Sequence, residues 1–150
     1  MALKEGDFVP DFSAKTQDGE VFNWSEYKGK AIVIYFYPKD NTPGCTTQAC
    51  GFRDEYQDFK DLGAEVIGVS GDSEASHEKF AEKYRIPFVL LSDGEKKIRK
   101  LFGVPTNLFG LIPGRVTYVV DANGVIRMVF DSMKAKDHIQ KAKEMLEQIK

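Results

Sequence analysis

The two cysteines, Cys45 and Cys50, are the residues whose type and spacing could do redox chemistry. They are the whole thiol inventory of the 150-residue chain, and both lie in the segment DNTPGCTTQAC, residues 40–50. Two cysteines are too few for a disulfide framework, and in an intracellular protein such a pair is more often catalytic than structural. The pair is therefore a candidate redox site.

Cys45 is predicted to lie in the first turn of a helix. The apolar run AIVIYFY, residues 31–37, predicts a buried strand that ends at Pro38. Thr42 is a good N-cap residue, and Pro43 suits a first helical turn. The free amides and the positive end of the helix dipole stabilise a thiolate there, which makes Cys45 a candidate nucleophile. The alternative is a small buried apolar residue, but a helix start after a loop favours an exposed sulfur.

The position of Cys50 sets a geometric condition on any bond to Cys45. Five residues of ideal helix rise about 7.5 Å and leave the two Cα atoms roughly 8–9 Å apart. A disulfide needs about 4.4–6.8 Å between Cα atoms. The two cysteines therefore cannot bond while this turn stays helical, and oxidation is predicted to unwind roughly residues 45–52.

A metal site is the other common use of paired cysteines. Structural zinc needs four ligands, usually in C-x₂₋₄-C pairs, whereas this chain has C-x₄-C and only two histidines, His77 and His138. Both histidines lie among charged residues of predicted helices, so we expect exposed side chains. Asp72 and Asp93 follow strand ends, where acids commonly cap helices; either Asp72 or Ser73 is expected to cap the helix that begins at Ser73. No GxGxxG or P-loop motif indicates a nucleotide cofactor.

Composition narrows the class of protein. The chain is 42% hydrophobic and 29% charged, as in ordinary globular proteins. Its net charge of −2 gives no basic surface for nucleic acid. No apolar run approaches the roughly 18–20 residues of a membrane span, and the N-terminus has no apolar core of a secretory signal. We expect a single domain over residues 1–150, soluble and intracellular.

Hydrophobic patterning predicts alternating strands and helices. Strands are predicted at 31–37, 64–70, 87–92, 115–120 and 125–130. Helices are predicted at 45–62, from Ser73 through Tyr84, at 96–102 and at 136–150. Turn pairs Asp18-Gly19 and Asn123-Gly124 each predict a hairpin. A helix between the first two long strands makes them parallel, so the fold class is α/β, with a mixed central β-sheet flanked by helices.

The run YFYPKDNTPGCTTQAC, residues 35–50, resembles the active site of the peroxiredoxins. It contains their P-x-x-x-T-x-x-C element as Pro38, Thr42 and Cys45. A second cysteine five residues on resembles the peroxiredoxin Q / bacterioferritin comigratory protein subfamily. GDFVPDF, AEVIGVSGDS and FGLIPGRVTYVVDANGVI extend the likeness over nearly the whole chain. The resemblance implies a thioredoxin-like fold with an N-terminal β-hairpin extension.

The resemblance also implies roles for five residues. Cys45 would be the peroxidatic cysteine, whose thiolate attacks a hydroperoxide and becomes a sulfenic acid. Cys50 would resolve that acid as an intramolecular disulfide. Arg115 would stabilise the thiolate and polarise the peroxide. Thr42 would hydrogen-bond the thiolate and the peroxide oxygen, and Pro38 would shield the sulfur from water.

Each of these roles has a plainer rival. Arg115 could be a structural ion-pair partner, Thr42 only a cap, and Pro38 only the end of a strand. Gln48 is expected as a supporting polar contact. The catalytic roles are favoured because all these residue types occur together at the family's spacing.

The implied enzyme is a thioredoxin-dependent peroxidase for hydrogen peroxide and organic hydroperoxides. Its expected partners are the hydroperoxide and thioredoxin or a similar dithiol reductant, without nucleic acid or membrane. No cofactor or metal is expected, and resolution within one chain favours a monomer. The compartment would be the bacterial cytoplasm or a plastid, after loss of a transit peptide. Rival functions are a thiol–disulfide oxidoreductase, which usually has C-x-x-C, and a redox sensor or chaperone.

Overall fold

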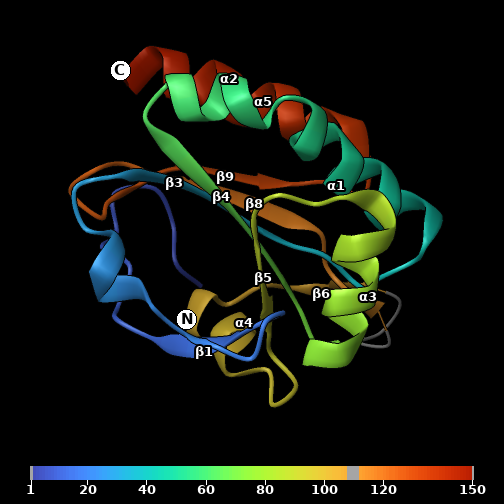
Figure 1. Ribbon diagram of the computed structural model, residues 1–150. Helices are drawn as coiled ribbons and strands as arrows, with labels where there is room; N and C mark the ends of the chain where they lie inside the picture. Colours follow the sequence, from blue (N-terminus) through green and yellow to red (C-terminus); the bar gives the residue numbers. More distant parts are fainter. Residues whose placement is uncertain (1, 108–111, 150) are drawn as a thin grey trace.

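A mixed sheet of seven strands forms the centre of the computed structural model, which describes residues 2–107 and 112–149 (Figure 1). The strand order is β2-β1-β5-β4-β3-β8-β9. The strands are β1 (Ser13–Thr16), β2 (Val21–Asn23), β3 (Ala31–Phe36), β4 (Ala64–Ser70), β5 (Val89–Ser92), β8 (Val116–Val120) and β9 (Ile126–Asp131). A separate two-stranded sheet joins β6 (Thr106–Asn107) and β7 (Ile112–Pro113).

The helices connect these strands in the predicted alternation. They are the 3₁₀ helix η1 (Trp24–Tyr27) and the α-helices α1 (Pro43–Asp54), α2 (Tyr56–Asp61), α3 (Glu74–Tyr84), α4 (Lys97–Phe102) and α5 (Ala135–Ile149). β3, β4 and β5 are parallel, and β8 pairs antiparallel on the other side of β3. Both predicted hairpins are present, with Gly19 and Gly124 at φ values of 80° and 83° in their turns. The predicted mixed α/β sheet is thus confirmed.

The sheet is covered on both faces, which explains why β3 is apolar along its whole length. Its residues alternate between two cores. Val33 and Tyr35 pack with side chains from α1, α2, α3 and α5, whereas Ile32 and Ile34 pack on the opposite face with α4 and the N-terminal segment. Figure 1 shows α1, α2 and α5 stacked along one side of the sheet, and α4 beyond the other side.

Several element boundaries differ from the sequence prediction. The helix predicted over 45–62 divides at Glu55, whose φ of −107° and ψ of 12° leave the helical region. The break lets α1 pack on α5 while α2 packs on β4. Strands β5 and β8 begin later than predicted, at Val89 and Val116. η1 and the β6–β7 pair were not predicted, and part of the family-like FGLIPGR segment, residues 109–111, lies outside the described residues.

Within the described ranges, no helix has both the length and the apolar character that a membrane span needs.

Candidate active site

Cys45 lies in the first turn of α1, as predicted, but its side chain is buried with only 1% exposed. The expected exposure was wrong. α1 starts just past the end of β3 and lies over the sheet, so the face that carries Cys45 and Phe52 turns inward, into the core that holds Tyr35 and Tyr37. The thiol therefore sits in an environment with little water, where each nearby charge or hydrogen-bond donor has a strong effect.

Arg115 supplies such a donor. Its Nη2 lies 3.3 Å from Cys45 Sγ, and its Nη1 donates to Gln48 Oε1 on the next turn of α1. Arg115 is only 4% exposed. Antiparallel pairing explains the placement: Phe36 at the end of β3 is opposite Val116 at the start of β8. Arg115, which immediately precedes β8, therefore lies next to α1, the helix that follows β3.

Two further donors in this group point to a small oxygen-containing ligand. Arg115 Nε and Gln48 Nε2 are buried, and no atom of the described residues accepts a hydrogen bond from either. Buried donors are normally satisfied. A peroxide would offer acceptor oxygens to such donors and would be polarised by the guanidinium charge.

Thr42 and Pro38 lie in the segment between β3 and α1. Thr42 occupies the N-cap position, yet its hydroxyl donates to the carbonyl oxygen of Lys39 at 2.9 Å instead of accepting from an amide of α1. Thr42 is thus the predicted N-cap residue by position, although its side chain makes no capping hydrogen bond. Pro38 follows Tyr37 just beyond β3 and is half-buried. The two residues belong to the short connection between strand and helix.

Cys50 is on the same helix as Cys45, half-buried and with a free thiol. α1 runs unbroken from Pro43 to Asp54 with both cysteines reduced. This is the state that the helical spacing requires, because an intact helix holds the two Cα atoms too far apart for a disulfide.

The two histidines contradict their predicted exposure, since both side chains are 0% exposed. His138 Nε2 donates to the carbonyl oxygen of Ser132 at 2.6 Å, and its Nδ1 lies 2.7 Å from the hydroxyl of Thr117. Burial lowers the pKa of His138, although the bond to Ser132 opposes the shift. The helical register contained a signal for this: His138 is four residues before buried Ala142. Charged neighbours obscured it.

Asp72 and Asp93, which follow β4 and β5, form different kinds of hydrogen bond. Asp93 accepts from the amides of Ile98 and Arg99 and so caps the start of α4, as interpreted. Asp72 does not cap α3; Ser73 does, by accepting from the amide of Ser76. Asp72 accepts instead from the loop that precedes α1.

Comparisons with known proteins identify the family. The model of the AhpC/TSA family matches residues 6–129. A chloroplastic peroxiredoxin Q of Sedum lineare is 51% identical over 149 residues, covering 99% of this chain and 80% of its own length. A peroxidoxin structure from Mycobacterium tuberculosis is 35% identical with a TM-score of 0.91, and the match covers 99% of each chain.

A third relative is named for an activity. The structure of a Xanthomonas campestris bacterioferritin comigratory protein, described for its alkyl peroxide reduction activity, is 29% identical. The TM-score is 0.88, covering 98% of this chain and 97% of that one. The fold is the predicted thioredoxin-like fold of the peroxiredoxins, and peroxide reduction by a thiol is the activity it serves. The chain therefore belongs to the AhpC/TSA family of peroxiredoxins, in its peroxiredoxin Q and bacterioferritin comigratory protein branch.

Proposed function

We propose that Cys45 is the peroxidatic cysteine of a thiol peroxidase that acts in antioxidant defence. The observation that supports this most directly is the buried contact between Arg115 Nη2 and Cys45 Sγ at 3.3 Å. The Cys45 thiolate attacks one oxygen of the hydroperoxide, an S–O bond forms and the O–O bond breaks. Sulfur loses two electrons, and the leaving oxygen takes a proton to become water or an alcohol. Arg115 and the first amides of α1 would hold the developing charge.

Cys50 is proposed as the resolving cysteine of the same chain. Its thiol condenses with the Cys45 sulfenic acid, so that water leaves and a disulfide forms. The step requires α1 to unwind around residues 45–52, because the helical Cα separation is too large. Thr42, which lies at the N-cap, is proposed to contact the sulfur and the peroxide, and Pro38 to limit water at the site.

The thiol reductant is proposed to be thioredoxin, which would attack the disulfide and return both cysteines to thiols. The substrates are proposed to be hydrogen peroxide and organic hydroperoxides, the latter because a relative is described for alkyl peroxide reduction. We propose that no metal or organic cofactor takes part, since the sulfur carries the electrons, and that one chain of a single domain is sufficient. Chloroplastic names among the relatives favour a plastid over the bacterial cytoplasm.

The deciding experiment is mass spectrometry with blocked thiols. The protein receives one equivalent of hydrogen peroxide and then reduced thioredoxin. We expect a loss of two hydrogens that maps to Cys45–Cys50 and is reversed by thioredoxin. Two free thiols after peroxide would contradict the function. A disulfide that forms once and is never recycled would support a redox sensor instead.

A further inference from the structure

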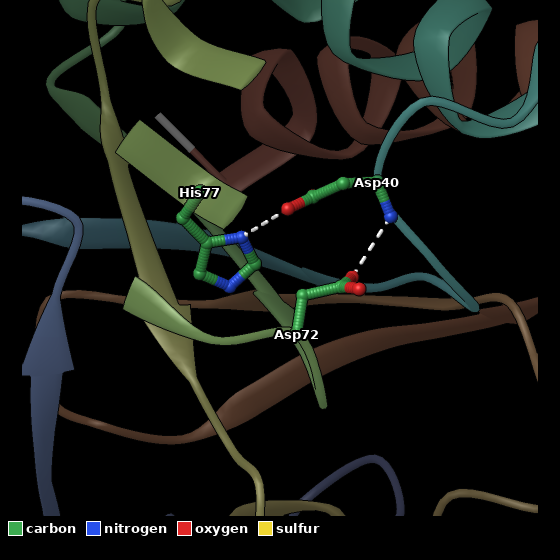
Figure 2. Close-up of side chains that lie close together, drawn as sticks. All are labelled: Asp40, Asp72 and His77. Atoms are coloured by element: carbon green, nitrogen blue, oxygen red, sulfur yellow. Dashed lines mark hydrogen bonds and ion pairs between the residues drawn. The ribbon is translucent and has the colours of Figure 1, made fainter. Parts of the chain in front are cut away.

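A second buried polar cluster lies beside the active-site loop and is not part of the peroxidase chemistry described above. In Figure 2, the Asp40 side chain points toward the ring of His77, and the Asp40 amide points toward the carboxylate of Asp72. His77 Nδ1 is 2.7 Å from Asp40 Oδ2, and the Asp40 amide nitrogen is 2.8 Å from Asp72 Oδ2. Asp40 is 4% exposed and His77 0%. The cluster joins the loop before α1 to the start of α3.

The hydrogen-bond partners fix the number of protons on this pair. His77 Nε2 faces the carbonyl oxygen of Leu91 at 3.0 Å and must donate to it, whereas Nδ1 faces the Asp40 carboxylate. A carbonyl and a carboxylate are both acceptors. One proton must therefore lie between Nδ1 and Oδ2, which makes the pair neutral as a whole. The Tyr37 hydroxyl also lies 3.4 Å from His77 Nδ1, but it donates to Asp40 Oδ1 at 2.6 Å. At His138, the Thr117 hydroxyl 2.7 Å from Nδ1 can donate to that nitrogen.

Other donors complete the coordination of Asp40. Tyr37 donates to Oδ1 at 2.6 Å, and Ser76 donates to Oδ2 at 2.9 Å. Burial, the neighbouring Tyr35 and the charge of Asp40 raise the pKa of Tyr37 well above its usual 10.0, so its hydroxyl keeps its proton. Asp40 is thus held by Tyr37 just after β3, by Ser76 of α3 and, through its amide, by Asp72 just after β4.

The same residue types could in principle hold a metal ion, since ligand atoms of Asp40, Asp72 and His77 lie within 4.8 Å of one another. The observed bonds favour a proton-linked network instead. The Asp40 carboxylate already receives a hydroxyl from Tyr37 and one from Ser76, besides its proton-sharing contact with the ring. Each facing atom is therefore accounted for by a hydrogen bond.

We propose that the Asp40–His77 pair is a positioning element of the peroxidase site. Asp40 lies two residues before Thr42 and five before Cys45, on the loop whose course sets the start of α1. The pair anchors this loop to α3 and neutralises the Asp40 carboxylate. Removing the imidazole alone would release the loop and leave a buried, unbalanced negative charge five residues before Cys45. Both effects would disfavour the charged form of the sulfur.

The inference rests on the proposed role of Cys45, and a double-mutant cycle tests it separately. The variants are His77→Gln, Asp40→Asn and the two combined. Each is also made with Cys50→Ser, so that Cys45 is the only thiol whose oxidation and alkylation are measured. Two quantities are measured on the full chain: the rate constant for Cys45 oxidation by hydrogen peroxide, and the pH midpoint of its alkylation by iodoacetamide. Phe80→Leu is the matched control, because Phe80 is a fully buried residue of α3.

We expect His77→Gln to slow oxidation about tenfold and to move the alkylation midpoint to higher pH, since a buried charge has lost its partner. The double variant, in which two amides can pair without charge, should recover much of the midpoint. Phe80→Leu should lower the melting temperature but leave both quantities unchanged. If His77→Gln does not fold, Asp40→Asn alone should still slow oxidation.

Two results would overturn the proposal. One is an oxidation rate and midpoint equal to the parent in every folded variant of the pair. The other is a Phe80→Leu protein that slows as much as the pair variants at equal loss of stability. Neither result would contradict the proposed function, which depends on whether the parent protein forms and recycles the Cys45–Cys50 disulfide.

Discussion

The guanidinium of Arg115 lies directly against the backbone of Gly44, the residue before Cys45. A Cβ added at Gly44 would stand 2.9 Å from Arg115 Nη2 and 3.7 Å from its Cζ. Nη2 is the same nitrogen that contacts Cys45 Sγ. A residue without a side chain at this position therefore lets the cation reach the sulfur.

Gly44→Ala should consequently impair the chemistry more than the fold. The new methyl group would push Nη2 away from the sulfur and weaken a hydrogen bond to a charged group, which contributes about 2 kcal/mol. We expect peroxide oxidation of Cys45 to slow by roughly 30-fold, measured by competition against a peroxidase of known rate.

Gly51→Ala is the control for that substitution. Gly51 is on the same helix, and its added Cβ would meet Ile139 Cδ1 of α5 at 2.9 Å. This change should lower stability through overpacking without slowing oxidation of Cys45. Equal slowing in both variants would mean that the Gly44 effect is only a general strain of α1.

Substitution of Arg115 separates charge from geometry. Arg115→Lys keeps the cation but loses the planar fork that spans Cys45 and Gln48, and Arg115→Ala loses both. We expect the rate of Cys45 oxidation to fall in the order Arg, Lys, Ala, by about 100-fold in total, while circular dichroism remains that of a folded protein. A lysine variant with the full parental rate would show that charge alone is sufficient.

Most candidate site residues could be named from local motifs because they belong to one strand–loop–helix segment. Pro38, Thr42 and Cys45 lie within eight residues of sequence, and the N-terminal turn chemistry of a helix is local. Arg115 came only from the family resemblance, since its approach to Cys45 depends on β8 pairing beside β3. No local pattern encodes which strand will be the neighbour.

The buried polar residues were the part that sequence reasoning missed. His77 precedes Glu78 and Lys79, so its surroundings in the sequence resemble an exposed helix face. Its burial is stabilised by Asp40 and Leu91, which are distant along the chain. A polar residue can be buried when tertiary partners satisfy it, and those partners appear only once the sheet is assembled.

Oxidation should melt the part of α1 that separates the cysteines. Amide hydrogen exchange, compared between reduced protein and protein oxidised by one equivalent of peroxide, should lose protection over residues 45–52. Strand β4 serves as the internal reference and should be unchanged. In Cys50→Ser, oxidation of Cys45 should leave the helix protected, because no disulfide pulls on it. Equal protection of this segment in both redox states of the parent would contradict the unwinding.

The buried His138 predicts a loss of stability on acidification. Burial lowers its pKa below the ordinary value of 6.5, so between these two values the unfolded chain binds a proton that the folded protein resists. Stability from this group is therefore complete above about pH 6.5 and declines as the pH falls toward the lowered pKa. His138→Gln removes the titrating group, at a cost of about 1–3 kcal/mol at pH 7.5 from disturbed hydrogen bonds.

The free energy of unfolding in urea, measured between pH 7.5 and 5.0, checks this. The parent should lose more stability over that range than His138→Gln. His77 is present in both proteins, so its own contribution cancels in the difference, provided that the two sites are independent. Parallel curves would show that His138 takes up a proton equally in the folded and unfolded states. The hydrogen bond that its Nδ1 makes with the hydroxyl of Thr117 would then have to reverse its direction.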